Sequence, residues 1–198
     1  ADIDAPYVTL SAWIQTPDTA ANKGYVISKN YDGANNYSLN AGGSGYPTLV
    51  DGIACYKGAW ANSGLNTPLR GTGWRHLAGT YDGTRFKLYV DGLPDAASTE
   101  TSGPLPLNNL TTDLGRYGLG AAYFEGLMDE VRIEAVPRSS NWIRAAWLNQ
   151  SAPSSFLITT QFTGAPMATE LRDLFAESGI DTQRWIRHGD DNSVFVSK

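Results

Sequence analysis

The sequence is poor in cysteine, in long apolar runs and in clustered positive charge. Its single cysteine, Cys55, cannot form an internal disulfide bond, so packing and hydrogen bonds must hold the fold together. No apolar run approaches the roughly 20 residues that a membrane-spanning helix needs. The 15 Lys and Arg residues form no cluster, and with 20 Asp and Glu residues the net charge is −5. Nucleic acid and membrane insertion are therefore excluded as leading partner classes.

Glycine and proline are abundant, at 21 and 10 of 198 residues. This composition is typical of many short strands joined by tight turns. A chain of this length is normal for one all-β sandwich, and it buries roughly 70% of its unfolded surface on folding. The sequence therefore predicts one stable all-β domain that needs no covalent crosslinks.

The stretch from Gly71 to Pro94, GTGWRHLAGTYDGTRFKLYVDGLP, gives the clearest structural prediction. Its two Asp-Gly pairs, Asp82-Gly83 and Asp91-Gly92, suit type I′ hairpin turns, which need positive φ at both central residues. With Asp82-Gly83 as a two-residue turn, Tyr81 pairs with Thr84 and the rest of the register follows. The flanks alternate between apolar and polar residues, as a half-buried antiparallel sheet requires.

Further strands are predicted from alternating or β-branched runs, and helices from the change of period after residue 138. Ser139 or Ser140 can cap a helix over residues 141–149, and a second helix is expected over 163–178. Trp60 falls in a predicted loop. We divide the chain into a sandwich domain, 1–162, and an extension packed on it, 163–198. The other predicted strands cover residues 7–14, 25–29, 37–40, 112–115, 124–133 and 155–161, and residues 48–56 are left unassigned.

Four ordered motifs resemble the laminin-G-like domains, of bacterial type, in the concanavalin A-like jelly-roll superfamily. They are WRHLAGTYDGTRFKLYVDG, VTLSAWIQT at 8–16, YVISKNYDGANNYSLNAGG at 25–43 and LGRYGLGAAYFEGLMDEVRIEAVPRS at 114–139. The resemblance implies a two-sheet antiparallel jelly-roll sandwich with short C-terminal helices. It also implies an exported bacterial protein, at an extracellular, periplasmic or cell-surface location. The fold alone leaves function open, because it hosts lectins, adhesion modules, lyases and glycosidases.

Asp129 is the first candidate functional residue, as a ligand of a metal ion. It is expected to share a strand face with Val131 and Ile133, and a carboxylate among core residues must be compensated. In related jelly rolls the matching Asp often binds a structural Ca²⁺ together with backbone carbonyls, and calcium prefers such oxygen ligands. The alternative is that backbone amides satisfy Asp129.

Catalysis is the second candidate role, with Glu130, Glu134 and His76 as the residues. Two carboxylates roughly 5–10 Å apart support glycoside hydrolysis, but residues i and i+4 of a strand lie about 13 Å apart. The competing interpretation of the two glutamates is a surface ion pair with Arg132, and that of His76 is a structural role.

Ligand binding is the third candidate role, and it rests on aromatic residues in predicted loops rich in glycine and asparagine. Aromatic faces stack on sugar C–H surfaces, although each ring alone is as well explained by packing. We expect non-catalytic binding of a carbohydrate or cell-surface glycoprotein. The alternatives are a polysaccharide hydrolase or lyase with a site on the concave sheet, and a structural or assembly domain. The candidate residues are Tyr31, Tyr46, Trp60, Tyr117 and Tyr123.

A sheet edge is the last feature of interest. Related domains carry one more strand before residue 7, and its loss is expected to leave an unpaired edge. Such an edge is covered by the chain itself or recruits another chain. Residues 155–161 are the internal candidate, and a partner chain is the alternative.

Overall fold

The computed structural model describes residues 3–17, 24–31, 34–42, 52–57, 59–98, 102–118, 123–156, 185–188 and 193–196. The chain divides into two compact units, residues 1–157 and 158–198. The domain boundary expected at residue 162 stays a prediction. In the second unit, β11 (Trp185–His188) and β12 (Ser193–Val196) form an antiparallel hairpin. None of the described helices has the length and hydrophobicity to span a membrane.

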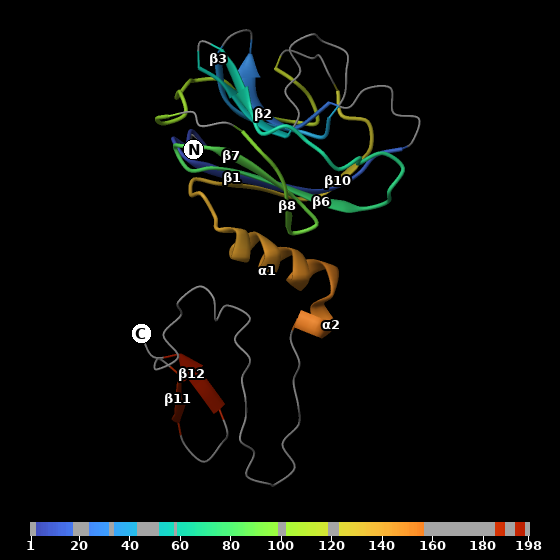
Figure 1. The fold of residues 1–198 in the computed structure, drawn as a ribbon, viewed down its shortest axis with the longest axis vertical. Helices are drawn as coiled ribbons and strands as arrows, with labels where there is room; N and C mark the ends of the chain where they lie inside the picture. Colours follow the sequence, from blue (N-terminus) through green and yellow to red (C-terminus); the bar gives the residue numbers. More distant parts are fainter. Residues whose placement is uncertain are drawn as a thin grey trace. The chain divides into compact units, whose positions relative to one another are not determined.

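Two five-stranded antiparallel sheets make up the first unit, stacked as Figure 1 shows, which confirms the predicted two-sheet sandwich. The first sheet has the order β10-β1-β6-β7-β8 and the second β5-β4-β3-β2-β9. The strands of the first sheet are β1 (Val8–Gln15), β6 (Arg75–Tyr81), β7 (Phe86–Val90), β8 (Leu93–Ala97) and β10 (Leu127–Glu134). Those of the second are β2 (Tyr25–Tyr31), β3 (Ala34–Asn40), β4 (Gly52–Tyr56), β5 (Trp60–Asn62) and β9 (Asp113–Leu114).

The core lies between the two sheets and is filled by alternate residues of the strands. Each fully buried Leu, Ile or Phe contributes roughly 1.5–3 kcal/mol to stability. Gly79 of β6 marks a close approach of the sheets, because a Cβ added there would lie 2.5 Å from Cβ of Ile53 in β4. Cys55 is fully buried in the same core. Burial, opposed in part by Lys57, raises the pKa of its thiol to about 12, so it is an unreactive packing residue.

The β6–β7–β8 meander confirms the central prediction with one correction. Val90 pairs with Leu93 around Asp91 and Gly92, both at positive φ, as a two-residue turn requires. The first turn differs: Tyr81 pairs with Phe86 rather than with Thr84. The Asp82 carboxylate accepts hydrogen bonds from the backbone of Thr84 and Arg85 and so stabilises a four-residue loop. The register moves by two residues, which leaves every side chain on its expected face.

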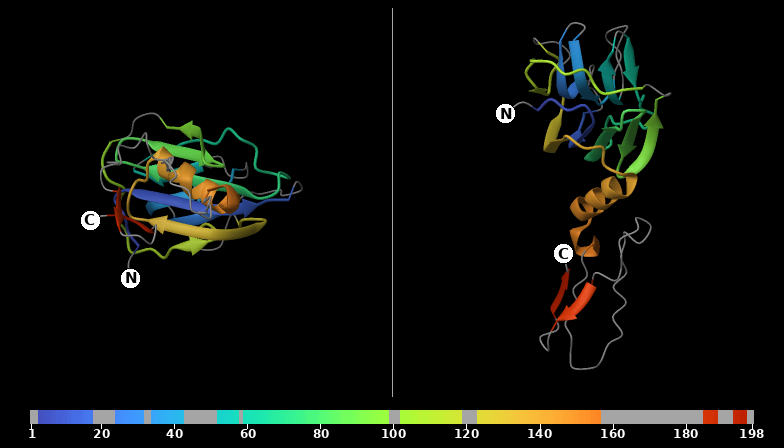
Figure 2. Two further views of the ribbon diagram at one scale, coloured as in Figure 1. Left: turned by 90° about the horizontal axis from the view of Figure 1, so that it is seen from below. Right: turned by 90° about the vertical axis from the view of Figure 1, so that its left-hand side faces the viewer.

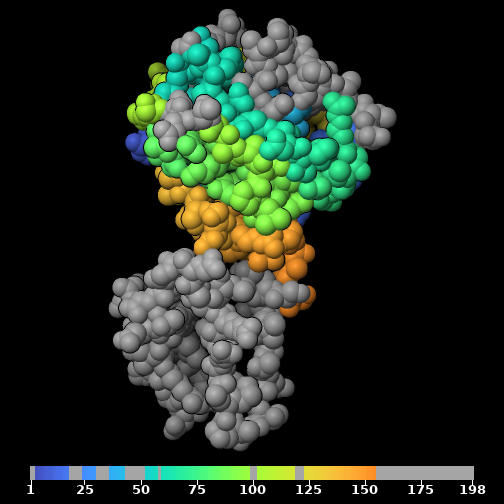
Figure 3. Space-filling view, in the orientation of Figure 1, coloured from blue at the N-terminus to red at the C-terminus, as the bar shows by residue number. Residues whose placement is uncertain are grey.

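The helix α1 (Ser140–Ser151) follows the last strand, and Ser139 caps it by accepting a hydrogen bond from Trp142 N–H at 3.2 Å. It lies against the outer face of the first sheet, the face turned away from the second sheet (Figures 1 and 2). There the fully buried Ile143 packs with Ala78 of β6 and Tyr89 of β7. The space-filling view shows the orange helix directly beside the green strands of this sheet (Figure 3).

Two other expectations are corrected by the structure, and the expected sheet edge stays open. The short helix α2 (Pro153–Phe156) includes residues 155 and 156, which were expected to begin a strand over 155–161. The rest of that expected strand, 157–161, and the helix expected at 163–178 lie outside the described residues. Trp60 belongs to strand β5, not to a loop. β1 is paired on both sides, with β10 and β6, and the two five-stranded sheets described here end in the edge strands β10, β8, β5 and β9. A partner chain at an edge stays a proposal.

Candidate functional site

The short edge strand β9 carries a turn that is firmly fixed to its neighbour β2. Asp113 pairs with Ser28, whose Oγ also donates a hydrogen bond to the carbonyl oxygen of Arg116 at 2.8 Å. The backbone N–H of Gly115 donates to Val26 at 3.1 Å, and Gly115 adopts φ +72°, a conformation that favours glycine. The turn therefore brings Arg116 back toward Asp113 and holds both on a rigid sheet.

Arg116 and Asp113 form an ion pair at the surface. Nε and Nη2 of Arg116 donate to the same oxygen, Oδ1 of Asp113, at 3.0 and 2.7 Å. The arginine side chain is 45% exposed and the aspartate 11%. Asp113, with a smaller contribution from Tyr123, raises the pKa of Arg116, so the guanidinium stays charged. In the described part of the chain, Oδ2 of Asp113 accepts no hydrogen bond. The pair therefore offers a ligand the unused N–H donors of Arg116 and the Oδ2 acceptor of Asp113.

Two tyrosines lie near this pair: Tyr117 directly follows Arg116, and Tyr123 is close enough to contribute to the pKa of Arg116. The ring of Tyr117 packs on the buried Tyr25 of β2, with their centroids 5.0 Å apart. Tyr123 is 58% exposed. Its backbone is held against Gly24, where an added Cβ would lie 2.2 Å from the carbonyl oxygen of Tyr123. We call Asp113, Arg116, Tyr117 and Tyr123 the β9 surface.

The predicted aromatic residues divide between the two edges of the second sheet. Tyr117 and Tyr123 both lie at the β9 edge, because the N–H of Phe124, directly after Tyr123, donates to the carbonyl oxygen of Gly115. Trp60 lies at the opposite edge, in β5, where its ring meets that of Tyr56 edge to face with centroids 5.6 Å apart. Tyr31 is the last residue of β2, and its side chain lies outside the described part, as does all of Tyr46. The ion pair of the β9 surface was not predicted, although the Asp-x-x-Arg spacing beside Tyr117 was visible in the sequence.

Asp129 does not share a face with Val131 and Ile133, so that expectation is wrong. Asp129 pairs with Trp13, whose indole N–H reaches Gln150 of α1, and it therefore lies on the outer face of the first sheet. The cause is a bulge at Glu130, which adopts φ +49° and changes the alternation of β10. Asp129 is exposed, and its Oδ1 accepts a hydrogen bond from Glu130 N–H at 2.8 Å.

In the described part of the chain, other metal-ligating side chains do not gather around Asp129. Among the described residues, no three His, Cys, Asp or Glu side chains come close enough to hold a metal ion. Asp129 instead satisfies one oxygen within its own bulge, as the alternative interpretation expected. Calcium binding at Asp129 stays a prediction.

Thermal unfolding tests that prediction, because a cation that binds only the folded state raises the melting temperature. If Asp129 holds calcium, excess Ca²⁺ should raise the melting temperature relative to chelator, and Asp129→Asn should remove the difference. Identical curves for the wild type in Ca²⁺ and in chelator would contradict a calcium site.

Glu130 and Glu134 are both engaged by arginines close in sequence. Glu130 pairs with Arg132, and Glu134 pairs with Arg138, whose Nε lies 2.9 Å from Oε1. Arg138 also lies over the ring of Trp142 at the start of α1. These contacts favour the interpretation of the two glutamates as ion pairs at the sheet edge.

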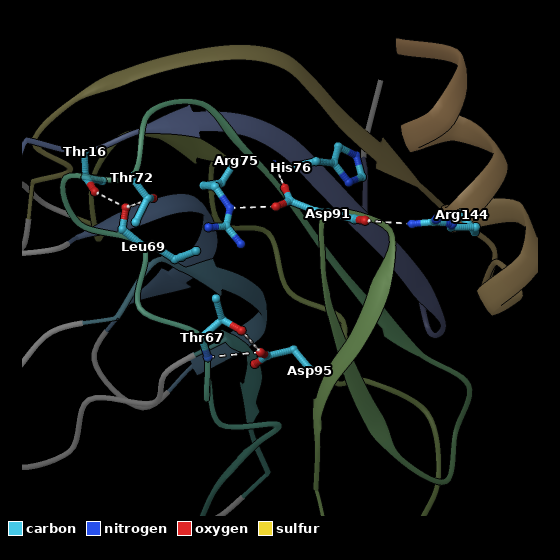
Figure 4. A network of polar contacts seen from close by, with 9 residues as sticks. All are labelled: Thr16, Thr67, Leu69, Thr72, Arg75, His76, Asp91, Asp95 and Arg144. Atoms are coloured by element: carbon cyan, nitrogen blue, oxygen red, sulfur yellow. Dashed lines mark hydrogen bonds and ion pairs between the residues drawn. The ribbon is translucent and has the colours of Figure 1, made fainter. Parts of the chain in front are cut away.

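His76 lies on the outer face of the first sheet, beside α1 (Figure 4). It is 4% exposed, its ring meets that of Trp13 edge to face, and its backbone N–H donates to Asp91 at 2.9 Å. Burial lowers its pKa to about 4, although Asp91 acts in the opposite direction. The same Asp91 carboxylate pairs with Arg75, and the backbone carbonyl oxygen of Asp91 accepts a hydrogen bond from Arg144 of α1 (Figure 4). This environment favours a neutral structural histidine.

Comparison with known proteins places this geometry in a family. The family described as the concanavalin A-like lectin/glucanases superfamily matches residues 2–144. Domain 4 of AbnA, a GH43 extracellular arabinanase from Geobacillus stearothermophilus solved with arabinotriose, is 19% identical, with a TM-score of 0.56 over 71% of this chain and 66% of that one. A candidate carbohydrate binding protein from Bacteroides ovatus ATCC 8483 is 24% identical, with a TM-score of 0.55 over 70% of this chain and 40% of that one.

No curated protein matches this sequence significantly. At these identities the two solved structures show a shared fold, and the chain spans less than half of the Bacteroides ovatus structure. The family match covers both sheets and reaches into α1. The chain therefore belongs to the concanavalin A-like lectin/glucanases superfamily, as a laminin-G-like domain.

Proposed function

We propose that this chain is a non-catalytic binding module that recognises carbohydrate, free or on a cell-surface glycoprotein, through the β9 surface. The observation that carries the proposal is an exposed tyrosine, Tyr123, beside the hydrogen-bonded Arg116–Asp113 pair. An aromatic face covers the C–H side of a sugar ring, and neighbouring polar groups select its hydroxyls. Both kinds of group are needed for a glycan site, and both are present here.

The rigidity of the β9 surface supports the proposal. Ser28 and Val26 of β2 fix the turn that carries Arg116, and the N–H of Phe124 donates to Gly115 at 2.9 Å directly after Tyr123. Groups that are already held in place lose little conformational entropy when a ligand binds. Weak polar contacts to a sugar can then yield a useful affinity.

The comparisons support the same class of function. AbnA domain 4, which shares the fold, was solved in complex with arabinotriose, and it belongs to an extracellular enzyme. We extend this to propose that the present chain is a module of an exported bacterial protein. The ion pairs of Glu130 and Glu134, and the burial of His76, support binding without catalysis.

Incubation of the full chain with a panel of polysaccharides tests the proposal. Affinity electrophoresis should show retardation by at least one polysaccharide, with no new reducing ends and no unsaturated products. New products would favour the hydrolase or lyase, and a panel without any retardation would contradict glycan binding.

Replacing Tyr123 by alanine is predicted to weaken glycan binding about tenfold, which corresponds to roughly 1.4 kcal/mol of lost stacking. The melting temperature should hardly change, because the side chain is 58% exposed. Tyr7→Ala is the matched control: Tyr7 is 40% exposed but lies beside Gly83, at the β6–β7 turn. Calorimetric titration with a retained oligosaccharide gives both affinities, and equal losses in the two variants would argue against the β9 surface.

A further inference from the structure

We infer that the β9 surface selects neutral glycans and that the Arg116–Asp113 pair recognises two adjacent hydroxyl groups of one sugar ring. This inference rests on the proposed function and names the class of ligand for the same site. It is carried by the hydrogen bonds of the pair, by the charges around it and by the exposed ring of Tyr123.

The hydrogen-bonding capacity left on the pair fits a diol. A guanidinium group has five N–H donors, and two of them are used on Oδ1 of Asp113. Within the described residues, the remaining donors of Arg116 and the Oδ2 acceptor of Asp113 have no protein partner. A sugar hydroxyl both donates and accepts, so two neighbouring hydroxyls can accept from Arg116 and donate to Asp113.

The charge of the pair argues against acidic sugars. Arginine binds a carboxylate best through two parallel N–H groups, and Asp113 already occupies the Nε and Nη2 edge of Arg116, which leaves only the Nη1–Nη2 end of a guanidinium whose charge is already paired. The positive charge is compensated at 2.7 Å, so a uronate or sialate gains little attraction from it. The net charge of −5 adds repulsion toward an acidic sugar.

Matched pairs of neutral and acidic oligosaccharides test the inference on the full chain. Useful pairs are galactotriose with trigalacturonate, lactose with sialyllactose, and xylotriose with its glucuronosyl derivative, together with arabinotriose. We expect the neutral member of any pair that binds to bind at least tenfold more tightly than the acidic member. Its affinity should change less than threefold between about 50 and 500 mM NaCl, because no net charge is neutralised.

The outcomes separate the inference from the proposed function. An acidic member that binds as tightly as its neutral counterpart, with an affinity that falls as salt rises, overturns the inference and leaves glycan binding intact. Absence of binding across the whole panel overturns the proposed function and the inference with it.

Two variants test the role of the pair itself. Asp113→Asn keeps the shape but removes the compensating charge, so the preference for the neutral member should fall at least tenfold. Arg116→Lys keeps the charge but removes the planar fork, so neutral affinity should fall about tenfold with an unchanged melting temperature. Arg70→Lys is the control, because Arg70 is exposed and lies in the bridge to Thr16, outside the β9 surface. Unchanged neutral affinity and unchanged preference in both variants would overturn the inference.

Discussion

A Gly79→Val variant is expected to lose about 3 kcal/mol of folding free energy, the upper end of the usual cost of overpacking a core. Gly79 is in the middle of β6, between Leu10 of β1 and Leu88 of β7. An added Cβ would lie 2.5 Å from Cβ and 2.9 Å from Cγ2 of Ile53 in the facing sheet. Both contacts are shorter than van der Waals distance, and the valine methyl groups add further volume where the sheets meet.

The sign of this effect distinguishes packing from strand propensity. Valine favours strands over glycine by up to roughly 1 kcal/mol, so propensity alone predicts a more stable variant. Gly64→Ala is the control, since Gly64 has a positive φ of +77° but, in the part of the chain that the structure describes, no atom lies within 4 Å of an added Cβ. The Gly64→Ala variant should lose only about 1 kcal/mol of folding free energy, the cost of holding a residue other than glycine at positive φ. Urea unfolding curves measure both, and a Gly79→Val variant as stable as the wild type would contradict this sheet packing.

The second large effect is a loss of stability in acid that comes from His76. Burial lowers the pKa of its imidazole from 6.5 to about 4 in the folded chain. Between these values the unfolded chain binds a proton that the folded chain does not, so the stability conferred by His76 is complete above about pH 6.5 and falls as the pH falls to about 4. A difference of this size corresponds to about 3 kcal/mol.

Replacing His76 by phenylalanine isolates this contribution from the general acid sensitivity of the carboxylates. The ring packs against Trp13, and among the described residues its Nδ1 has no hydrogen-bond partner, so an apolar ring suits the position. The His76→Phe variant should lose about 3 kcal/mol less than the wild type between pH 7 and pH 4. His188→Gln, which changes the other histidine, should behave as the wild type. Parallel stability profiles for His76→Phe and the wild type would show that His76 is not buried as described.

The strands of the central meander were predictable because their signals are local. Alternating residues fix the faces of β6 and β7, and Asp91-Gly92 adopts the positive φ values that the pair favours. The same Asp-Gly pair at residues 82–83 gave the wrong register, because the Asp82 side chain bonds the backbone beyond the turn. Competition between side-chain and backbone hydrogen bonds is decided by the full loop, which a dipeptide does not specify.

The outward orientation of Asp129 could not be predicted from sequence. It depends on Glu130 at φ +49°, a conformation that is uncommon for a residue other than glycine and carries no sequence signature. One inserted residue then exchanges the two faces of the strand before it. For the same reason, the candidate site was predicted only in part. The aromatic character of Tyr117 and Tyr123 is visible in the sequence, but their proximity to Arg116 depends on how β9 pairs with β2.

Chemical-shift mapping is the most direct test of glycan binding at the β9 surface. The isotope-labelled full chain is titrated with the oligosaccharide of the panel that binds most tightly, and backbone amide shifts are followed by NMR. The largest shifts should fall on Asp113 to Tyr117 and on Tyr123 and Phe124, with weak effects at Tyr56 and Trp60 on the opposite edge. Shifts centred on β4 and β5, with the β9 residues unmoved, would contradict the account.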